Sequence, residues 1–217
     1  MKPSNLSISK DYDHNRELAS FADYIFIAVR PTVVPVVLAQ IKDLISDKIV
    51  ISLASVSKNI PIRIMPNLAI ANGHGVIGLY ADKKVSRAKV AQVKKLLSGL
   101  GLVVDCKKES DLDTLTLMSG SGIAVAAYLM QTLAGYGVKR GMDAKLSQQV
   151  VTAVFKGALK CLKEDKATFS QFIEAVATKG GTTEVILADL TKSNFPKKFL
   201  RAMSIGEKRI KALKRKI

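Results

Sequence analysis

The hydrophobic pattern of the chain changes once, near residues 107–112, and this change limits what the chain can fold into. Before it, short continuous apolar runs alternate with turns and helical stretches, a pattern typical of buried parallel strands joined by helices. After it, apolar residues recur at i, i+3 and i+4, as in helices that bury one face. The sequence therefore predicts an α/β domain over residues 1–108 and an all-helical domain over residues 109–217.

The apolar runs of the first domain give specific strands, and their alternation with helices favours a parallel sheet with right-handed crossovers. The connection at residues 58–61 is an exception, because four residues are too few for a crossover helix. We therefore expect the strand that follows it to be displaced or paired differently. The expected strands are residues 24–29, 49–53, 62–65, 76–80 and 102–106. The expected helices are residues 33–45, 84–97, 123–136, 143–162, 168–178, 183–190 and 196–213.

The charge of the chain points to anionic partners. A net charge of +16 favours a phosphorylated cofactor, an acidic small molecule or nucleic acid. Residues 192–217 hold ten Lys or Arg and one acidic residue. This run fits a solvated helix face better than a polyanion site, and its two rings, Phe195 and Phe199, are spaced for a helix core rather than for base stacking. We expect no nucleic-acid partner.

The cysteines and the apolar runs indicate a cytoplasmic protein. Cys106 and Cys161 do not form a disulfide framework and are most simply small buried apolar residues. The longest apolar stretch considered for a membrane span, residues 25–41, is broken by Arg30 and two prolines. No signal peptide and no membrane partner are expected.

Two local patterns could bind an anion or a nucleotide. Gly180-Gly181-Thr182-Thr183 lies between two helical patterns, where backbone N–H groups at a helix start suit a carboxylate or phosphate. An ordinary N-cap with a glycine hinge is the alternative. Residues 28–31 end a strand where an open α/β sheet binds its ligand, although the proline there also serves simply to stop the strand. No metal site is expected, because His14 and His74 are far apart in polar turns.

Three spaced blocks, in order along the chain, resemble the pyrroline-5-carboxylate reductase family. The first comprises His14-Asn15-x-Glu17 and Ala28-Val29-Arg30-Pro31, the second Arg63-x-Met65-Pro66-Asn67 and Gly73-x-Gly75, and the third Ser119-Gly120-Ser121-Gly122 and the Gly-Gly-Thr-Thr turn. The resemblance implies a Rossmann-like cofactor domain followed by an all-α dimerisation domain that forms a homodimer or a higher oligomer.

The resemblance also implies an oxidoreductase of proline biosynthesis. Hydride would pass from NADPH or NADH to the C=N bond of 1-pyrroline-5-carboxylate, a cyclic imino acid, and the cofactor carries the hard chemistry. Thr183 would be the catalytic residue. The residues implied for substrate binding are Gly180, Gly181, Thr182, Thr178, Ser119 and Ser121. Those implied for cofactor binding are Asn15, Ala28, Val29, Arg30, Pro31, Ala54, Met65, Pro66 and Asn67.

The chain departs from the family pattern in places that bear on function. The family opens with a strand, a GxGxxG turn and a helix, and nothing before Asn15 corresponds to them. The resemblance thus implies a truncated member with an incomplete parallel sheet and with weakened or absent cofactor binding. Residues 24–29 and 49–53 would lack a neighbouring strand unless a dimer partner or a rearranged sheet supplies one. In the pocket, Ile123 and Val125 replace the family's Pro and Tyr. A catalytically degenerate paralogue that acts as a dimeric binding or interaction protein is the alternative.

Overall fold

A computed structural model describes residues 6–9, 14–54 and 60–215. The chain divides into two compact units. The first, which we call the sheet unit, comprises Met1–Ser121 and Gly206–Ile217, and the second, the helical unit, comprises Gly122–Ile205. The domain boundary predicted between residues 108 and 109 stays a prediction.

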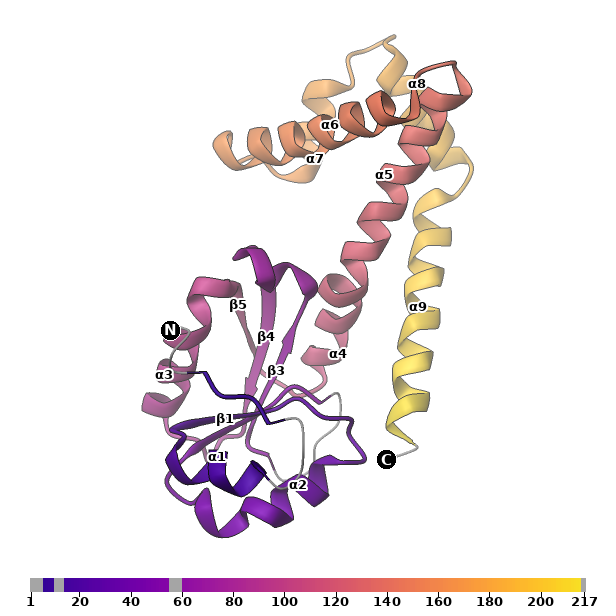
Figure 1. The fold of residues 1–217 in the computed structure, drawn as a ribbon. Coiled ribbons are helices and arrows are strands. Elements are labelled where there is room, and N and C mark those ends of the chain that lie inside the picture. The colour runs from indigo at the N-terminus through magenta and orange to yellow at the C-terminus, as the bar shows by residue number, and fades with distance from the viewer. Residues whose placement is uncertain (1–5, 10–13, 55–59, 216–217) are drawn as a thin grey trace. The chain divides into compact units, whose positions relative to one another are not determined.

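The described part of the sheet unit contains five strands, at the places that the apolar runs predict (Figure 1). These runs are rich in β-branched residues, which pack well on a pleated surface. The strands follow one another in space in the order β1-β2-β3-β4-β5. Their bounds are β1 (Tyr24–Ile27), β2 (Ile49–Ser52), β3 (Ile62–Pro66), β4 (Gly75–Ala81) and β5 (Gly101–Cys106).

The sheet is mostly parallel, but one pair of strands corrects the prediction of a parallel sheet. β3 and β4 pair antiparallel, in a register that runs from Ile62 opposite Ala81 to Pro66 opposite Ile77. The short 3₁₀ turn η4 (Leu68–Asn72) joins the two strands, and Gly73 follows it with φ 71°. Such a left-handed turn returns the chain beside the strand it has just left, and this produces an antiparallel neighbour.

The pairing of β2 with β3 also differs from expectation. The two strands are parallel, through the pairs Ile51–Ile62 and Ser52–Arg63, although their connection was predicted to be too short. Because only two residue pairs overlap, β3 begins about 3 Å, one residue rise, before the end of β2 along the strand direction. So small a step back needs no crossover helix. The first two strands find their neighbours within the same sheet, because β1 pairs with β2, and β2 lies between β1 and β3.

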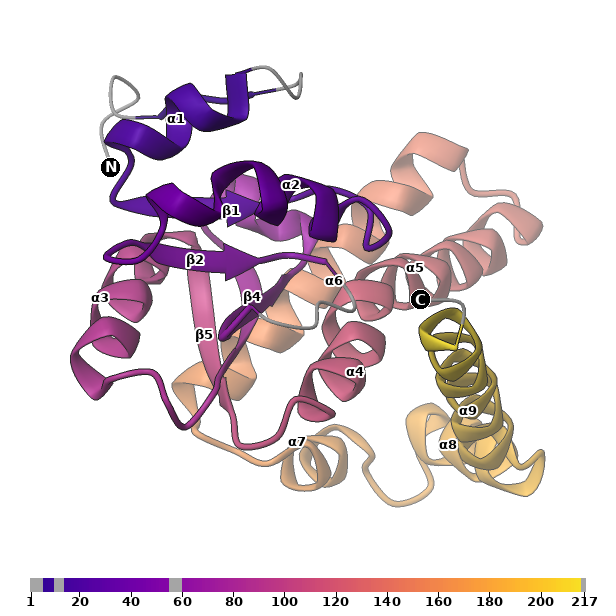
Figure 2. The same cartoon turned by 90° about the horizontal axis from the view of Figure 1, so that it is seen from below.

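Helices cover the two faces of this sheet and enclose two apolar clusters. On β2, Val50 belongs to one cluster and Ile51 to the other, as expected for side chains that alternate between faces. The first cluster includes Val37 from α2, and the second includes Val93 from α3. Figure 2 shows α1 and α2 on one side of β1 and β2. The bounds are α1 (Asn15–Phe21), α2 (Val34–Ile41), η3 (Lys42–Leu44), α3 (Arg87–Leu97), η5 (Ser98–Leu100), α4 (Asp111–Leu115) and the π-helical turn η6 (Thr116–Ser121).

The helical unit is built from the five helices that the sequence predicts. They are α5 (Gly122–Lys139), α6 (Ala144–Glu164), α7 (Phe169–Val176), α8 (Thr182–Lys192) and α9 (Phe195–Lys214), the last of which ends in the sheet unit. Asp143 caps α6 by accepting the backbone N–H of Leu146 at 2.9 Å. α5 and α6 pack so closely that a side chain on Gly137 would collide with Ser147.

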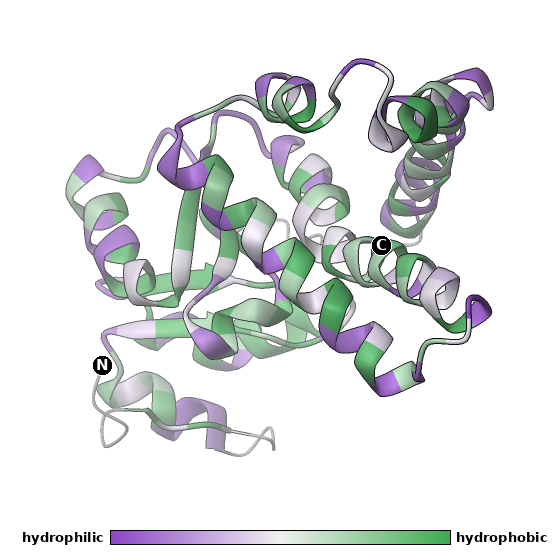
Figure 3. Ribbon diagram, turned by 90° about the horizontal axis from the view of Figure 1, so that it is seen from above, coloured by the Kyte–Doolittle hydropathy of each residue, from purple (hydrophilic) through white to green (hydrophobic). Residues whose placement is uncertain are grey.

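Many apolar side chains of the helical unit are exposed, including Tyr128, Val154 and Leu159. Figure 3 shows hydrophobic residues (green) recurring along the ribbons of the helices. By length and composition alone, the helical run Asp111–Lys139 could cross a membrane, contrary to the expectation that no stretch is long enough, and only 6% of its most apolar window is buried. Cys161 is exposed rather than buried as predicted. Cys106 is half-buried, and this burial raises the pKa of its thiol.

Candidate functional site

A cavity of about 100 Å³ lies at the carboxyl ends of β2 and β3. Ligands bind at this end of the strands in open α/β sheets. Two residues predicted to bind the cofactor, Ala54 and Met65, line it. The other lining residues come from the neighbouring strand ends, from α4 and η6, and from the last turns of α9: Leu53, Arg63, Ile64, Leu112, Asp113, Thr116, Ile210, Leu213 and Lys214.

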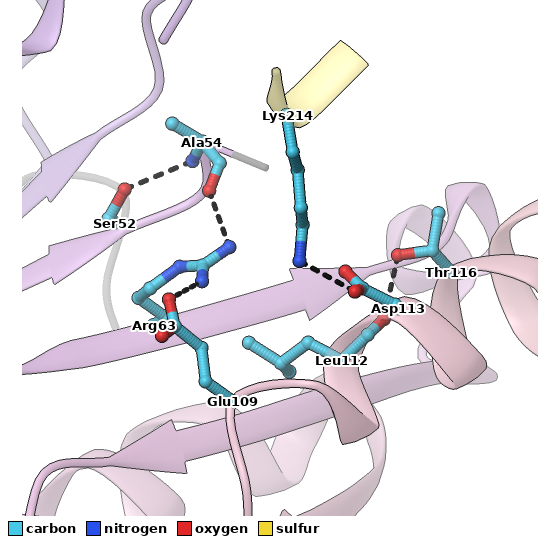
Figure 4. A network of polar contacts seen from close by, with 8 residues as sticks. All are labelled: Ser52, Ala54, Arg63, Glu109, Leu112, Asp113, Thr116 and Lys214. Carbon is cyan, nitrogen blue, oxygen red and sulfur yellow. Dashed lines mark hydrogen bonds and ion pairs between the residues drawn. The ribbon is translucent and has the colours of Figure 1, made fainter. Parts of the chain in front are cut away.

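A buried arginine holds one wall of this cavity (Figure 4). The side chain of Arg63 is only 5% exposed. Its Nη2 donates to the carbonyl oxygen of Ala54 at 3.1 Å, and its Nη1 forms an ion pair with Glu109. The N–H of Ala54 in turn donates to Ser52 Oγ at 3.1 Å. Arg63 was recognised in the sequence only as part of the second motif block, although a charged residue between Ile62 and Ile64 was a signal that it needs buried partners.

An ion pair on the opposite wall joins the end of α9 to α4. Lys214 Nζ lies 2.6 Å from Asp113 Oδ2, and both side chains are 31% exposed. One turn further on, Thr116 Oγ1 donates to the carbonyl oxygen of Leu112 at 2.7 Å. Sequence reasoning did not find Lys214, because it lies 101 positions from its partner in a run that looked like a solvated face.

The second and third motif blocks meet beside the cavity. Asn67 follows β3 and is 8% exposed. Its Nδ2 donates to the carbonyl oxygen of Ser119 at 3.3 Å, and its Oδ1 accepts the N–H of Val76 at 3.1 Å. Ser119 is equally buried and lies in the π-helical turn η6, a kind of turn that is often found at functional sites. A side chain on Gly120 would come within 3.2 Å of Met65 Cε, so glycine allows this close approach.

The first motif block occupies the carboxyl end of β1. Ala28, Val29 and Arg30 follow the strand and are exposed, while Pro31 is half-buried. The carbonyl oxygen of Arg30 accepts the N–H of Val33 at 2.8 Å, so these residues form a turn that leads into α2. Asn15 begins α1, and its Nδ2 donates to Gln40 Oε1 of α2 at 2.8 Å.

The Gly-Gly-Thr-Thr turn lies in the helical unit and precedes α8. Gly180 has φ 77°, and Gly181 caps α8 and donates its N–H to the carbonyl oxygen of Thr178 at 2.9 Å. The N–H of Gly180 donates to Glu184 Oε2 at 2.6 Å, so the turn already holds a carboxylate of the chain itself. Thr182 is exposed and Thr183 is half-buried, and Ser121 of the preceding motif is exposed in the sheet unit.

Two family models match the chain. The model of pyrroline-5-carboxylate reductase dimerisation matches residues 109–213. The model described as NADP oxidoreductase coenzyme F420-dependent matches residues 4–56. The first match contains η6 and the Gly-Gly-Thr-Thr turn, and the second contains β1, β2 and Ala54.

Comparison with individual proteins agrees with these matches. A pyrroline-5-carboxylate reductase from Coxiella burnetii is structurally similar, with a TM-score of 0.86 and 25% identity over 98% of this chain and 82% of that one. The Plasmodium falciparum pyrroline carboxylate reductase with NADP bound has a TM-score of 0.80 and 28% identity, over 91% of this chain and 79% of that one. The pyrroline-5-carboxylate reductase of Synechocystis sp. is 32% identical over 93% of this chain and 79% of its own length. This chain belongs to the pyrroline-5-carboxylate reductase family.

Proposed function

We propose that this protein reduces 1-pyrroline-5-carboxylate to proline with NAD(P)H. The observation that carries the proposal is the cavity at the carboxyl ends of β2 and β3, where Ala54 and Met65 meet the helical segment that contains Ser119. In this reaction the substrate gains a hydride at the carbon of its C=N bond and a proton at the ring nitrogen. The bound nicotinamide supplies the hydride.

The carboxyl ends of β1, β2 and β3 fit a nicotinamide nucleotide. The exposed turn formed by Ala28, Val29, Arg30 and Pro31 offers backbone and a cationic side chain beside the strand ends. Ala54 and Met65 supply apolar surface for a flat ring. The side chain of Asn67 bonds to both Val76 and Ser119, so it holds the end of β3 against η6.

The turn before α8 fits the substrate carboxylate. Its N–H groups and the positive end of the helix dipole favour an anion, and the contact between Gly180 and Glu184 supports this preference. In the proposed complex, the turn and Thr178 hold the carboxylate, while Ser119 and Ser121 lie on the wall of the substrate pocket. The hydroxyl of Thr183 delivers the proton to the ring nitrogen.

A second copy of the chain completes the helical unit in this proposal. The exposed apolar side chains of α5 and α6 lie within the match to the dimerisation family. An exposed apolar face on a helix calls for a partner surface, which here is the same face of a second subunit. This pairing also covers the apolar run Asp111–Lys139 without a membrane.

The proposal is tested by following the oxidation of NADPH by the purified chain in the presence of 1-pyrroline-5-carboxylate. Thr183→Ala should lower kcat by about 100-fold or more, because a positioned proton donor contributes about that much. Thr191→Ala is a matched control, since it removes an exposed threonine from the same helix and should leave kcat unchanged. A Thr183→Ala enzyme with wild-type kcat would refute this role. Absence of NADPH binding by the wild type at millimolar cofactor, with dimerisation intact, would favour the degenerate paralogue.

A further inference from the structure

Arg63 is a buried charge in the middle of an apolar strand. It lies between Ile62 and Ile64, which are 2% and 5% exposed. A charge at such a position is costly, and hydrophobic residues of similar volume can replace buried ion pairs with little loss of stability. The stability of the sheet therefore does not require an arginine at this position. The contacts that its side chain makes give a reason for it.

The guanidinium connects two segments that are distant in the sequence (Figure 4). One arm donates to the carbonyl oxygen of Ala54, just after β2, and the other pairs with Glu109, just before α4. Because the N–H of Ala54 is also bonded, to Ser52 Oγ, the peptide groups on both sides of Ala54 are fixed. A planar fork reaches two acceptors at once, which the single ammonium group of lysine does less well.

These two segments form facing walls of the cavity. Ala54 belongs to the wall formed by the strand ends, and Glu109 leads into α4, whose Leu112 and Asp113 line the other wall together with Thr116 of η6. We propose that Arg63 is a positioning residue that fixes the distance between these walls, and so aligns the nicotinamide ring with the substrate. This inference rests on the proposed reductase function.

A change in alignment has a kinetic signature that a general loss of stability does not. Misplacement of reacting groups by about 1 Å can lower the rate about 100-fold. Most of the nucleotide would contact other strand ends, so its affinity should change little. Arg63→Met should therefore lower kcat by about 10- to 100-fold while the KM for NADPH stays within about threefold. Arg63→Lys should recover part of kcat, because it retains the charge and one contact.

Glu109→Gln tests the second arm of the fork. The side chain of Glu109 is 48% exposed, so solvent screens the pair, and the bond from Arg63 to Ala54 remains. A decrease in kcat of only a few fold is expected. Lys94→Met is the matched control, because it removes an exposed ion pair with Asp105 elsewhere in the same unit. It should leave kcat and both KM values unchanged.

Amide hydrogen exchange gives a readout that does not require activity. In Arg63→Met, exchange at residues 52–54 should accelerate by about tenfold or more, while exchange in β5 stays at the wild-type rate. Wild-type exchange at residues 52–54 together with wild-type kcat would overturn the proposal, and so would equal acceleration throughout the unit.

Two further outcomes are distinguishable. If Arg63→Met does not fold, Arg63→Lys decides: the same local pattern at smaller amplitude supports the proposal, and a uniform loss of protection overturns it. If the wild type has no reductase activity, the proposed function fails, while the exchange pattern still shows whether Arg63 holds the end of β2.

Discussion

The sheet unit and the helical unit use their apolar residues in opposite ways. The sheet unit encloses two buried clusters between its strands and its helices. In the described part of the helical unit, Val151 is the one buried hydrophobic residue, although its helices carry many apolar side chains. The first unit completes a core within one chain, whereas the second presents an apolar surface that must be covered by something else.

The largest expected contrast comes from truncating one apolar side chain in each unit. Ile77 is 0% exposed, and Ile77→Ala should lower the free energy of unfolding by about 3 kcal/mol through lost burial and a cavity. Leu159 is 65% exposed within one chain, so Leu159→Ala should cost less than about 1 kcal/mol in the dissociated chain. Urea unfolding measures both. Equal small effects would break the claim that the sheet unit is self-contained.

A charge on the apolar surface of the helical unit should weaken its self-association. Val154 lies on α6 and is 52% exposed, and Val154→Lys should cost about 2 kcal/mol of association free energy because it places an unpaired charge in the interface. The dimer dissociation constant would rise roughly 30-fold, as measured by light scattering over a dilution series. Gln149→Lys adds the same charge at another exposed position of α6 and serves as control. If both variants associate like the wild type, this face does not form the interface.

Helix caps give a smaller contrast, of about 1 kcal/mol each. Ser86 Oγ accepts the N–H of Lys89 at 3.3 Å at the start of α3, which carries the buried Val93. Thr168 forms a reciprocal capping box with Gln171 at the start of α7, which has no buried residue. Ser86→Ala should lower the global stability of the sheet unit, whereas Thr168→Ala should mainly increase hydrogen exchange within α7. The reverse pattern would contradict the comparison.

The smallest expected effect is a pH dependence at the surface of the sheet unit. The hydrogen bonds from the Arg16 guanidinium hold the pKa of the Asp43 carboxyl below its ordinary value. A lowered pKa in the folded state stabilises the fold above the unfolded pKa, and this contribution is lost as the pH falls through the folded pKa. Asp43→Asn should therefore lose less stability than the wild type on acidification to pH 3. Asp47→Asn is the control. If Asp43→Asn loses as much stability on acidification as the wild type, the Arg16–Asp43 pair makes no such contribution.

The positions of the strands and of the last five helices could be predicted, because they depend on local periodicity. Continuous apolar runs marked the five strands, and Asp143 and Thr168 marked two helix starts. The antiparallel pairing of β3 with β4 could not be predicted, because it depends on how Gly73 turns the chain. The parallel pairing of β2 with β3 was also missed, because an overlap of two residue pairs needs a much shorter connection than a full crossover.

The site was predictable only in part, for a similar reason. The motifs pointed to Ala54, Met65 and Asn67, which follow or end strands, and the structure brings Asn67 to Ser119. The side chains that hold the cavity walls, Arg63 and Lys214, were not recognised, because their partners lie 46 and 101 positions away. Periodicity carries no information about contacts over such distances.

Sedimentation equilibrium of the purified chain is the most direct test of the central claim, that a family reductase with a self-contained sheet unit requires a second copy to complete its helical unit. The chain has a mass of 23.5 kDa. The account predicts a particle of twice that mass or a larger multiple, at micromolar concentration and in the absence of ligands. A folded, soluble particle with the mass of a single chain would contradict it.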